Sequence, residues 1–318
     1  MLEHRIAKLA ACAAFLLLII GGLVNATGSS LACPEAFVIC KKSILPKMTG
    51  GVLFEHGHRL LAMTVGFVQI ALTISLWRRR PALRKLGVLL LGMILLQGLF
   101  GATTVKFKLV WWVSTGHLLL GTTYFAMLIY TVFRTRAVMT PAQVELHERQ
   151  RAELGRVRAW ITAACVMVFV QLLLGGLVRH LGAALVCIGM PGCSPVHAMP
   201  DGGLQTLHMI HRCFGTLVGI VTIIAAIKVF IAAKSWPQLR AFVAIAPVLV
   251  LGQITLGIFT VLTLRAVPLA VAHFAGGESL WALWMYAWLM TGRYVPEPTG
   301  TLPKPTPLGG LGQPGVLS

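Results

Sequence analysis

The chain has 318 residues, of which 57% are hydrophobic and 11% are charged, whereas soluble domains carry about 25% charged residues. This composition excludes a soluble globular enzyme, a disordered regulator and a nucleic-acid-binding module. Lysine and arginine number 27 against nine Asp and Glu, which gives a formal net charge of +18. In so apolar a chain, we expect these charges to set orientation in a membrane.

Eight stretches are long and apolar enough to span a bilayer, because a spanning helix needs about 20 mostly apolar residues. In chain order they are 9–27, 55–76, 86–104, 110–133, 159–180, 206–233, 241–262 and 268–290. Basic residues precede the first stretch and gather after the second, fourth and sixth. The positive-inside rule therefore places these segments and both termini in the cytoplasm. The alternative for residues 1–27 is a cleaved signal peptide.

The sequence contains an internal duplication, which argues against that alternative because the first stretch has a counterpart in mid-chain. The repeated residues are Gly21-Gly22-Leu23-Val24 with Gly175-Gly176-Leu177-Val178, Cys33 with Cys187, Cys40 with Cys193, His58-Arg59 with His211-Arg212, Gln97 with Gln253, and His117 with His273. Each half has an even number of spans, so both halves enter the membrane from the same side. We therefore predict an all-α integral membrane protein with eight transmembrane helices, arranged as two tandem four-helix bundles related by a pseudo-two-fold axis.

This duplication divides the chain into four parts. Residues 1–133 form the N-terminal four-helix half, and 134–158 form a basic cytoplasmic linker. Residues 159–292 form the C-terminal half. The remainder, 293–318, is rich in Pro and Gly and is predicted to be a disordered cytoplasmic tail.

Four histidines lie one on each even-numbered stretch, within about two turns of its outer end. They are His58, His117, His211 and His273. A single histidine in a membrane helix is as readily explained by a hydrogen bond to a neighbouring carbonyl or hydroxyl as by metal binding. Four at similar depth favour metal ligation, and haem iron takes axial histidines within helical bundles, whereas zinc usually adds Cys, acids or a third His. The pattern predicts two bis-histidine haem sites, one per half.

The residues beside these histidines differ between the halves. Glu55 lies three residues before His58 and on the same helical face, whereas the equivalent residue in the second half is His208. This asymmetry indicates a division of labour in which the first half reacts and the second half stores or relays electrons. The alternative interpretation is that Glu55 is an exposed residue at the start of a helix, where the helix dipole favours an acidic side chain. Arg59 and Arg212 are candidates to bind haem propionates, or else snorkelling interfacial residues.

Two cysteine pairs lie in outward-facing loops, where thiols tend to be oxidised. Cys33 and Cys40 are seven residues apart, and Cys187 and Cys193 are six apart. A disulfide is predicted in each loop. For the first pair, a structural staple and a redox partner both stay open. Four further residues are given no role: Glu278, His56, His180 and His208.

From about residue 9 to 292, this set of motifs resembles the haem A synthase family of cytochrome oxidase assembly, in its bacterial form with cysteine pairs in the outer loops. The residues that carry the resemblance are Glu55-x-x-His58-Arg59, His117, His211-Arg212, His273 and the two cysteine pairs. Two segments do not match the family pattern: the residues between Cys33 and Cys40, and the lysine-bearing stretch 41–47. The resemblance implies an oxidoreductase that converts the C8 methyl group of haem O to a formyl group through hydroxylated intermediates.

The resemblance also implies roles for the individual residues. A haem b cofactor would be held in the C-terminal half by His211 and His273. The substrate haem would lie between His58 and His117, with Glu55 essential to the chemistry. Haem O synthase would be the upstream partner and the electron acceptor is unidentified. The protein would sit among lipids of the bacterial inner (plasma) membrane, with its haem sites near the outer face and no nucleic-acid partner.

Three other functions are consistent with parts of the pattern. A di-haem electron-transfer protein of the quinol-oxidising cytochrome b type explains the histidines but not the Glu55/His208 difference. A haem carrier would move haem without changing the porphyrin. A membrane thiol–disulfide oxidoreductase would depend on the four loop cysteines and not on the histidines.

Overall fold

The computed structural model describes residues 2–35, 39–137, 139–194 and 197–292. Within these ranges the chain is helical, with a single β-bridge between Cys40 and Ser43. The α-helices are α1 (Leu2–Ala26), α2 (Gly51–Arg79), α3 (Arg84–Lys106), α4 (Trp111–Arg134), α5 (Pro141–Glu153), α6 (Arg158–His180), α7 (Gly203–Ala232), α8 (Pro237–Val243), α9 (Ala246–Leu262) and α10 (Val267–Met290). The 3-10 helices are η1 (Pro81–Leu83) and η2 (Ala183–Leu185). The predicted tail, 293–318, lies outside the described residues.

Seven helical segments of the described chain are long and apolar enough to cross a bilayer. They are Leu2–Ala26, Gly51–Arg79, Pro81–Lys106, Trp111–Arg134, Arg158–His180, Gly203–Ala232 and Pro237–Leu262. A helix satisfies its own backbone hydrogen bonds and can therefore lie in hydrocarbon. The protein is thus a multi-pass membrane protein.

The eighth predicted span, 268–290, is helical as α10 but is not among the seven apolar segments. Its mean hydropathy is lowered by a polar and glycine-rich run, Gly276-Gly277-Glu278-Ser279, and by His273. α10 packs against α1, α4, α6, α8 and α9. Because so much of its surface contacts other helices, α10 needs less lipid-compatible surface than a peripheral span.

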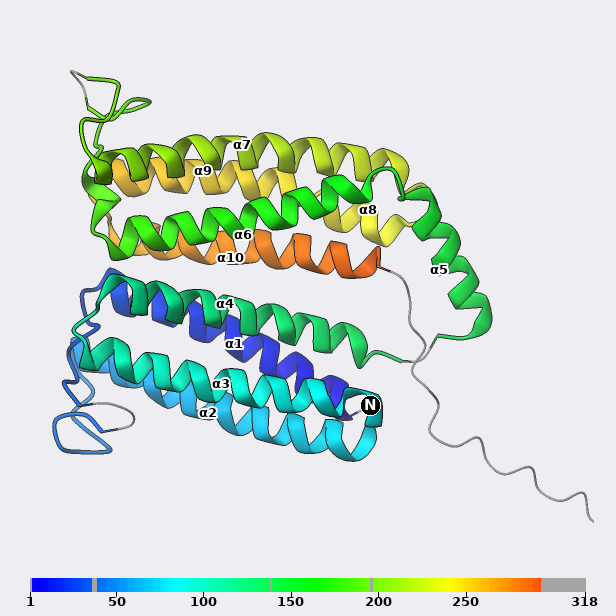
Figure 1. Cartoon of the computed structure of the whole chain (residues 1–318), viewed down its shortest axis with the longest axis horizontal. Helices are drawn as coiled ribbons and strands as arrows, with labels where there is room; N and C mark the ends of the chain where they lie inside the picture. The colour runs from blue at the N-terminus through cyan, green and yellow to red at the C-terminus, as the bar shows by residue number, and fades with distance from the viewer. Residues whose placement is uncertain (1, 36–38, 138, 195–196, 293–318) are drawn as a thin grey trace, which may run out of the picture.

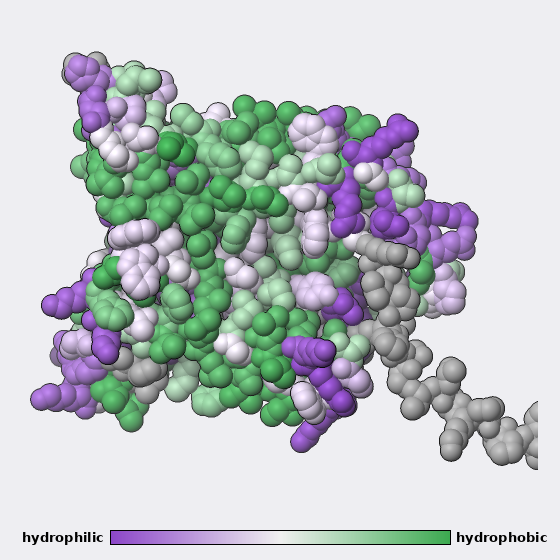
Figure 2. Space-filling view, in the orientation of Figure 1, coloured by the Kyte–Doolittle hydropathy of each residue, from purple (hydrophilic) through white to green (hydrophobic). Residues whose placement is uncertain are grey.

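The helices form two groups that lie side by side (Figure 1). α1 to α4 pack against one another, and α6 to α10 do the same. The groups meet where α1 contacts α10, and where α4 contacts α6 and α10. Both cysteine-bearing loops lie at one end of the molecule, and α5 lies at the other (Figure 1). Figure 2 shows a broad apolar middle with hydrophilic residues at both ends, as expected for a bilayer-spanning protein.

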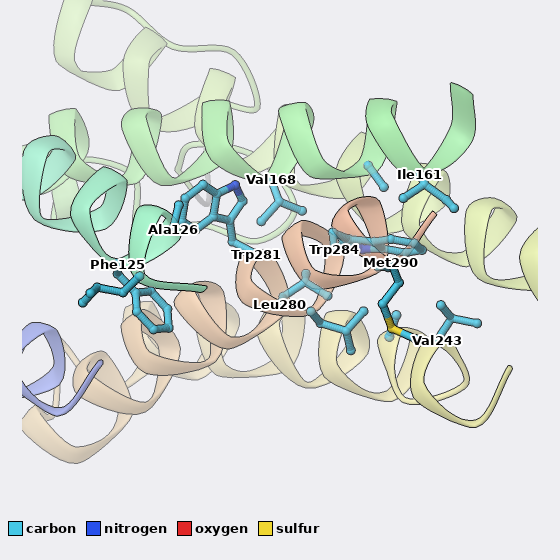
Figure 3. Packing of buried hydrophobic residues seen from close by; sticks show 14 of the residues in the cluster. Phe125, Ala126, Ile161, Val168, Val243, Leu280, Trp281, Trp284 and Met290 are labelled. Atoms are coloured by element: carbon cyan, nitrogen blue, oxygen red, sulfur yellow. The ribbon is translucent and has the colours of Figure 1, made fainter. Parts of the chain in front are cut away.

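The interior of the helical assembly is continuous between the two groups. Figure 3 shows Phe125 and Ala126 of α4 near Trp281 of α10 and Val168 of α6. These residues belong to one buried apolar cluster that extends to Trp284. Because side chains of both groups share this cluster, the groups are held together by packing as well as by the linker.

The same turn joins α3 to α4 and α9 to α10. In the first turn Lys108 and Leu109 have φ values of 50° and 65°, and in the second Leu264 and Arg265 have values of 52° and 68°. Left-handed backbone is costly for residues with a side chain. The left-handed conformation recurs at duplicated positions. This recurrence indicates that the helices on either side of each turn hold its backbone in that conformation.

The predicted linker, 134–158, contains the helix α5. This helix begins at a capping box in which Thr140 and Gln143 exchange hydrogen bonds. Nε2 of His147 lies 3.0 Å from the carbonyl oxygen of Gly292, and its ring packs edge-on against Trp236. The linker is thereby attached to the segments that follow α7 and α10.

Candidate functional site

Each of the four candidate ligand histidines packs against a glycine of the preceding long helix. A Cβ on that glycine would lie 3.2 Å from the imidazole in every case, for the pairs Gly21–His58, Gly101–His117, Gly175–His211 and Gly257–His273. This separation is shorter than an ordinary van der Waals contact. The absence of a side chain therefore lets each imidazole lie directly against the backbone of its neighbour helix.

His211 on α7 and His273 on α10 face each other in the second half. Their ring centroids are 6.5 Å apart and their planes are inclined by 88°. A metal–imidazole bond is about 2 Å long, and about 1 Å more separates the nitrogen from the ring centre, so two axial imidazoles have centres about 6 Å apart. The observed spacing therefore fits a bis-histidine haem iron.

Glutamine side and main chains contact both rings of this pair. The amide nitrogen of Gln171 lies 3.1 Å from Nδ1 of His211 and 3.0 Å from its carbonyl oxygen. Nδ1 of His273 lies 3.1 Å from the carbonyl oxygen of Gln253. A carbonyl only accepts, so Nδ1 of His273 donates and Nε2 keeps the lone pair that a metal needs. Sequence reasoning used Gln253 only as a repeat marker and missed Gln171.

His58 on α2 and His117 on α4 are the corresponding candidate pair in the first half. Gln97 donates to the carbonyl oxygen of His117 at 2.9 Å. Nδ1 of His117 is buried and has no hydrogen-bond partner among the described residues. This pair is therefore less constrained by hydrogen bonds to its rings than the pair in the second half.

Glu55 is buried, with 4% of its surface exposed, so it is not the exposed helix-start residue of the alternative interpretation. One carboxylate oxygen accepts the backbone N–H of Cys33 at 2.8 Å, and the other accepts from Arg59 at 2.6 Å. A buried carboxylate needs such partners to offset its lost hydration. Glu55 is therefore fixed between the start of α2 and the first cysteine loop.

The two arginines beside the ligand histidines bind the cysteine loops. Arg59 donates to the carbonyl oxygens of Cys33, Glu35 and Ile39 at 2.9, 2.6 and 2.9 Å. Arg212 donates to the carbonyl oxygens of Cys187, Gly189 and Gly192. Nε of Arg212 also lies 3.3 Å from Nε2 of His208, in the place of the Arg59–Glu55 contact. Binding of haem propionates by these arginines stays a prediction.

Both cysteine pairs are joined as the sequence predicts. The Cα atoms are 4.8 Å apart for Cys33–Cys40 and 4.2 Å apart for Cys187–Cys193, and all four residues are buried. In the first loop the carboxylate of Glu35 accepts a hydrogen bond from its own backbone N–H and from those of neighbouring loop residues. These bonds hold the pKa of Glu35 below its usual value.

Three residues left without a role occupy defined positions. His56 is fully buried beneath the first disulfide loop, with Nε2 2.9 Å from the carbonyl oxygen of Ile44. Nδ1 of His180 lies 3.0 Å from the hydroxyl of Thr115 and links α6 to α4. Glu278 on α10 accepts a hydrogen bond from Thr122 of α4 at 2.7 Å. None of these contacts is visible in the sequence pattern alone.

The chain is similar to known bacterial proteins over most of its length. It is 27% identical to a protein named Heme A synthase from Bacillus licheniformis, over 88% of this chain and 93% of that protein. It is 28% identical to proteins of the same name from Geobacillus kaustophilus, over 82% of each chain, and from Shouchella clausii, over 91% of this chain and 97% of that protein. A family model described as COX15-CtaA, cytochrome oxidase assembly protein, matches residues 45–285. The chain therefore belongs to the COX15-CtaA family of cytochrome oxidase assembly proteins.

Proposed function

We propose that the chain is a haem A synthase, an oxidoreductase that converts haem O to haem A. The C8 methyl group of haem O would become a formyl group through hydroxylated intermediates. The observation that carries this proposal is the pair of duplicated histidine sites with different neighbours. One has the buried carboxylate of Glu55 one turn from His58, and the other has an imidazole at the same position, His208. The relatives named Heme A synthase support the same conclusion.

In the second half, His211 and His273 would hold a resident haem b. Their 6.5 Å ring separation supports this assignment. When bound, that haem supplies one-electron transfer. The hydrogen bond from Nδ1 of His273 to the carbonyl oxygen of Gln253 keeps that imidazole oriented. Gln171 binds the backbone carbonyl of His211, and the glycine contacts on α6 and α9 limit the movement of both rings.

In the first half, His58 and His117 would hold the substrate haem. A site that must accept and release its haem gains from ligands with fewer fixed contacts, and Nδ1 of His117 lacks a partner in the described part of the chain. Glu55 would accept a proton or stabilise positive charge that develops at the oxidised carbon. Arg59 and the Cys33 N–H hold its carboxylate in one orientation for either role.

The proposed architecture is eight membrane spans, with α10 as the eighth, in two four-helix halves related by a pseudo-two-fold axis. Residues 1–133 would form the substrate half and 159–292 the cofactor half. The recurring glycine–histidine contacts and left-handed turns support this relation. Both termini would be cytoplasmic, and the haem sites and cysteine loops would lie near the outer face, because basic residues gather at the other end. Haem O synthase would supply the substrate, and an electron acceptor would complete the reaction.

The test is expression in a bacterial host that has haem O synthase but no haem A synthase of its own. Extraction and chromatography of the haems should yield haem A or its alcohol precursor. Glu55→Gln should leave haem O unconverted, whereas Glu145→Gln, which changes an exposed ion pair on α5, should not affect conversion. Unconverted haem O with the native chain would refute the proposal.

The same extraction separates the alternative functions. Two equivalent haem b groups, with neither haem O nor haem A, would favour an electron-transfer protein. Haem O that binds and leaves unchanged would favour a carrier. Loss of function on replacing all four loop cysteines by Ser, with dispensable histidines, would favour a thiol–disulfide oxidoreductase.

A further inference from the structure

The first disulfide has a buried imidazole beside it. The sulfur atoms of Cys33 and Cys40 and a ring nitrogen of His56 all lie within 4.8 Å of one another. All three residues have no exposed surface. They lie between the loop and the first turns of α2, where Val52 and Ala32 complete a small apolar cluster. Two sulfurs and an imidazole nitrogen are therefore enclosed together in a water-poor space.

The hydrogen bonding of His56 leaves one ring nitrogen available. Nε2 lies 2.9 Å from the carbonyl oxygen of Ile44. Because a carbonyl only accepts, Nε2 carries the proton and Nδ1 has the lone pair. Nδ1 is buried and has no hydrogen-bond partner among the residues that the structure describes. Leaving a buried acceptor without a partner is unfavourable. A metal-binding histidine has this same arrangement, with its second nitrogen donating to a carbonyl.

We propose that reduction of the Cys33–Cys40 disulfide creates a metal site in which the two thiolates and Nδ1 of His56 bind a thiophilic divalent ion such as Zn²⁺. A dithiol supplies two electrons and two protons to the disulfide and is itself oxidised to a disulfide. The two new thiols then lose their protons as the ion binds. Three protein ligands leave the fourth tetrahedral position to water or another donor.

The distances are compatible with this site once the S–S bond has opened. Zinc–sulfur bonds of about 2.3 Å and zinc–nitrogen bonds of about 2.0 Å place tetrahedral ligands about 3.5–3.8 Å apart. The two sulfurs and a ring nitrogen of His56 already lie within 4.8 Å of one another, and the Cα atoms of the cysteines are 4.8 Å apart. Side-chain rotation therefore suffices to bring the ligands into place. Thiolates favour zinc over hard ions such as Mg²⁺ and Ca²⁺.

The second disulfide provides an internal comparison. The residue equivalent to His56 is Met209, whose sulfur lies 4.0 Å from Nη1 of Arg212. Within the described residues, no other His, Cys, Asp or Glu side chain completes a ligand cluster with Cys187 and Cys193. Reduction of this second pair should therefore create no comparable site.

The test uses the purified full-length chain in detergent, before and after treatment with a phosphine reductant, which opens disulfides without adding thiols. Zn²⁺ binding is measured by competition with a chromophoric chelator, and Co²⁺ is used as a spectroscopic probe. The reduced chain should bind one more Zn²⁺ than the oxidised chain, and Co²⁺ should give a thiolate-to-metal charge-transfer band. The three free cysteines are present in both samples, so the difference reports on the disulfides.

Variants locate the site. The double substitution C33S/C40S should abolish the additional binding, and His56→Ala should weaken it on the order of 100-fold, whereas C187S/C193S should leave it unchanged. The proposal is wrong if the native chain binds no more Zn²⁺ after reduction, a comparison that needs no substitution. It is also wrong if His56→Ala binds Zn²⁺ as tightly as the native chain. Neither readout depends on haem A synthesis, so failure here leaves the proposed function intact.

Discussion

Gly257 and Gly252 lie on the same helix, α9, but differ in what an added methyl group would meet. A Cβ at Gly257 would lie 3.2 Å from Cε1 of His273, 3.6 Å from Nδ1 and 3.7 Å from Nε2. At Gly252, apart from the adjoining residues and nearby backbone of α9 itself, no atom of the described residues lies within 4 Å of the Cβ position. Gly257→Ala should therefore displace the imidazole, whereas Gly252→Ala should only improve helix propensity, by about 1 kcal/mol.

The size of the effect follows from how His273 is held. Its Nδ1 donates to the carbonyl oxygen of Gln253 at 3.1 Å, so the ring cannot turn away from the methyl group without weakening that bond. Overpacking costs about 1–3 kcal/mol, and one hydrogen bond contributes about 0.5–1.5 kcal/mol. If about 1–3 kcal/mol is lost from haem binding, Gly257→Ala should weaken haem retention about 5- to 150-fold.

The assay compares the two variants with the native chain after purification in detergent. The quantities measured are haem per chain and the rate of haem transfer to an excess of an acceptor haem protein. Gly257→Ala should release haem faster, and Gly252→Ala should behave like the native chain. Equal haem loss from both variants, or equal retention by both, would refute the role assigned to the glycine–histidine contact.

Three further predictions follow from other contacts. Thr122→Ala and Glu278→Ala should each lower the free energy of unfolding by about 1–3 kcal/mol. In thermal unfolding, the double variant should lose less stability than the two single variants added together, because the two residues share a 2.7 Å hydrogen bond. The pKa of Glu35 is lowered in the folded protein, so its contribution to loop stability is present above its unfolded pKa and is lost as the pH falls through its folded pKa. The rate at which a phosphine reduces the first disulfide should therefore rise on acidification. Glu35→Gln should remove that pH dependence. Gln171→Leu removes both contacts to His211 and should alter the absorption spectrum of the bound haem without releasing it; an unchanged spectrum would contradict this orienting role.

The sequence was sufficient for elements that depend on composition and spacing. Seven of the predicted spans coincide with apolar helices of the structure because a long apolar run has few alternatives to a membrane helix. α10 shows the limit of that reasoning. Its polar residues face other helices rather than lipid, as the buried Glu278 illustrates, and hydropathy does not distinguish an enclosed helix from a less apolar one.

The direction of a long side chain was harder to predict than its position. The repeat identifies Arg59 and Arg212 as neighbours of candidate ligands, but a guanidinium group at that position reaches either a haem edge or an adjacent loop. In the structure both groups donate to loop carbonyls. The partners are backbone oxygens, which every residue has, so no sequence motif marks them.

Two hydrogen bonds between the groups of helices bear on how the proposed halves came to differ. Arg179 donates to Asn25 at 2.6 Å, and Thr122 donates to Glu278 at 2.7 Å. Each pair joins equivalent positions of the duplication, offset by 154 residues in the first pair and by 156 in the second. In a symmetric dimer a residue on the two-fold axis meets its own copy, so a glutamate or an arginine there would face a like charge.

In a symmetric dimer, equivalent positions must carry the same residue. A fused chain removes that constraint because each copy of a position can be substituted separately. An acid can then face a hydroxyl, and a guanidinium can face an amide, which are the combinations observed. The Glu55/His208 difference is of the same kind, but it lies beside the candidate haem sites rather than between the halves. Covalent duplication therefore provides what the proposed division of labour requires. It gives two candidate sites that share their histidines and the glycine contacts to them, but have different neighbours at Glu55 and His208.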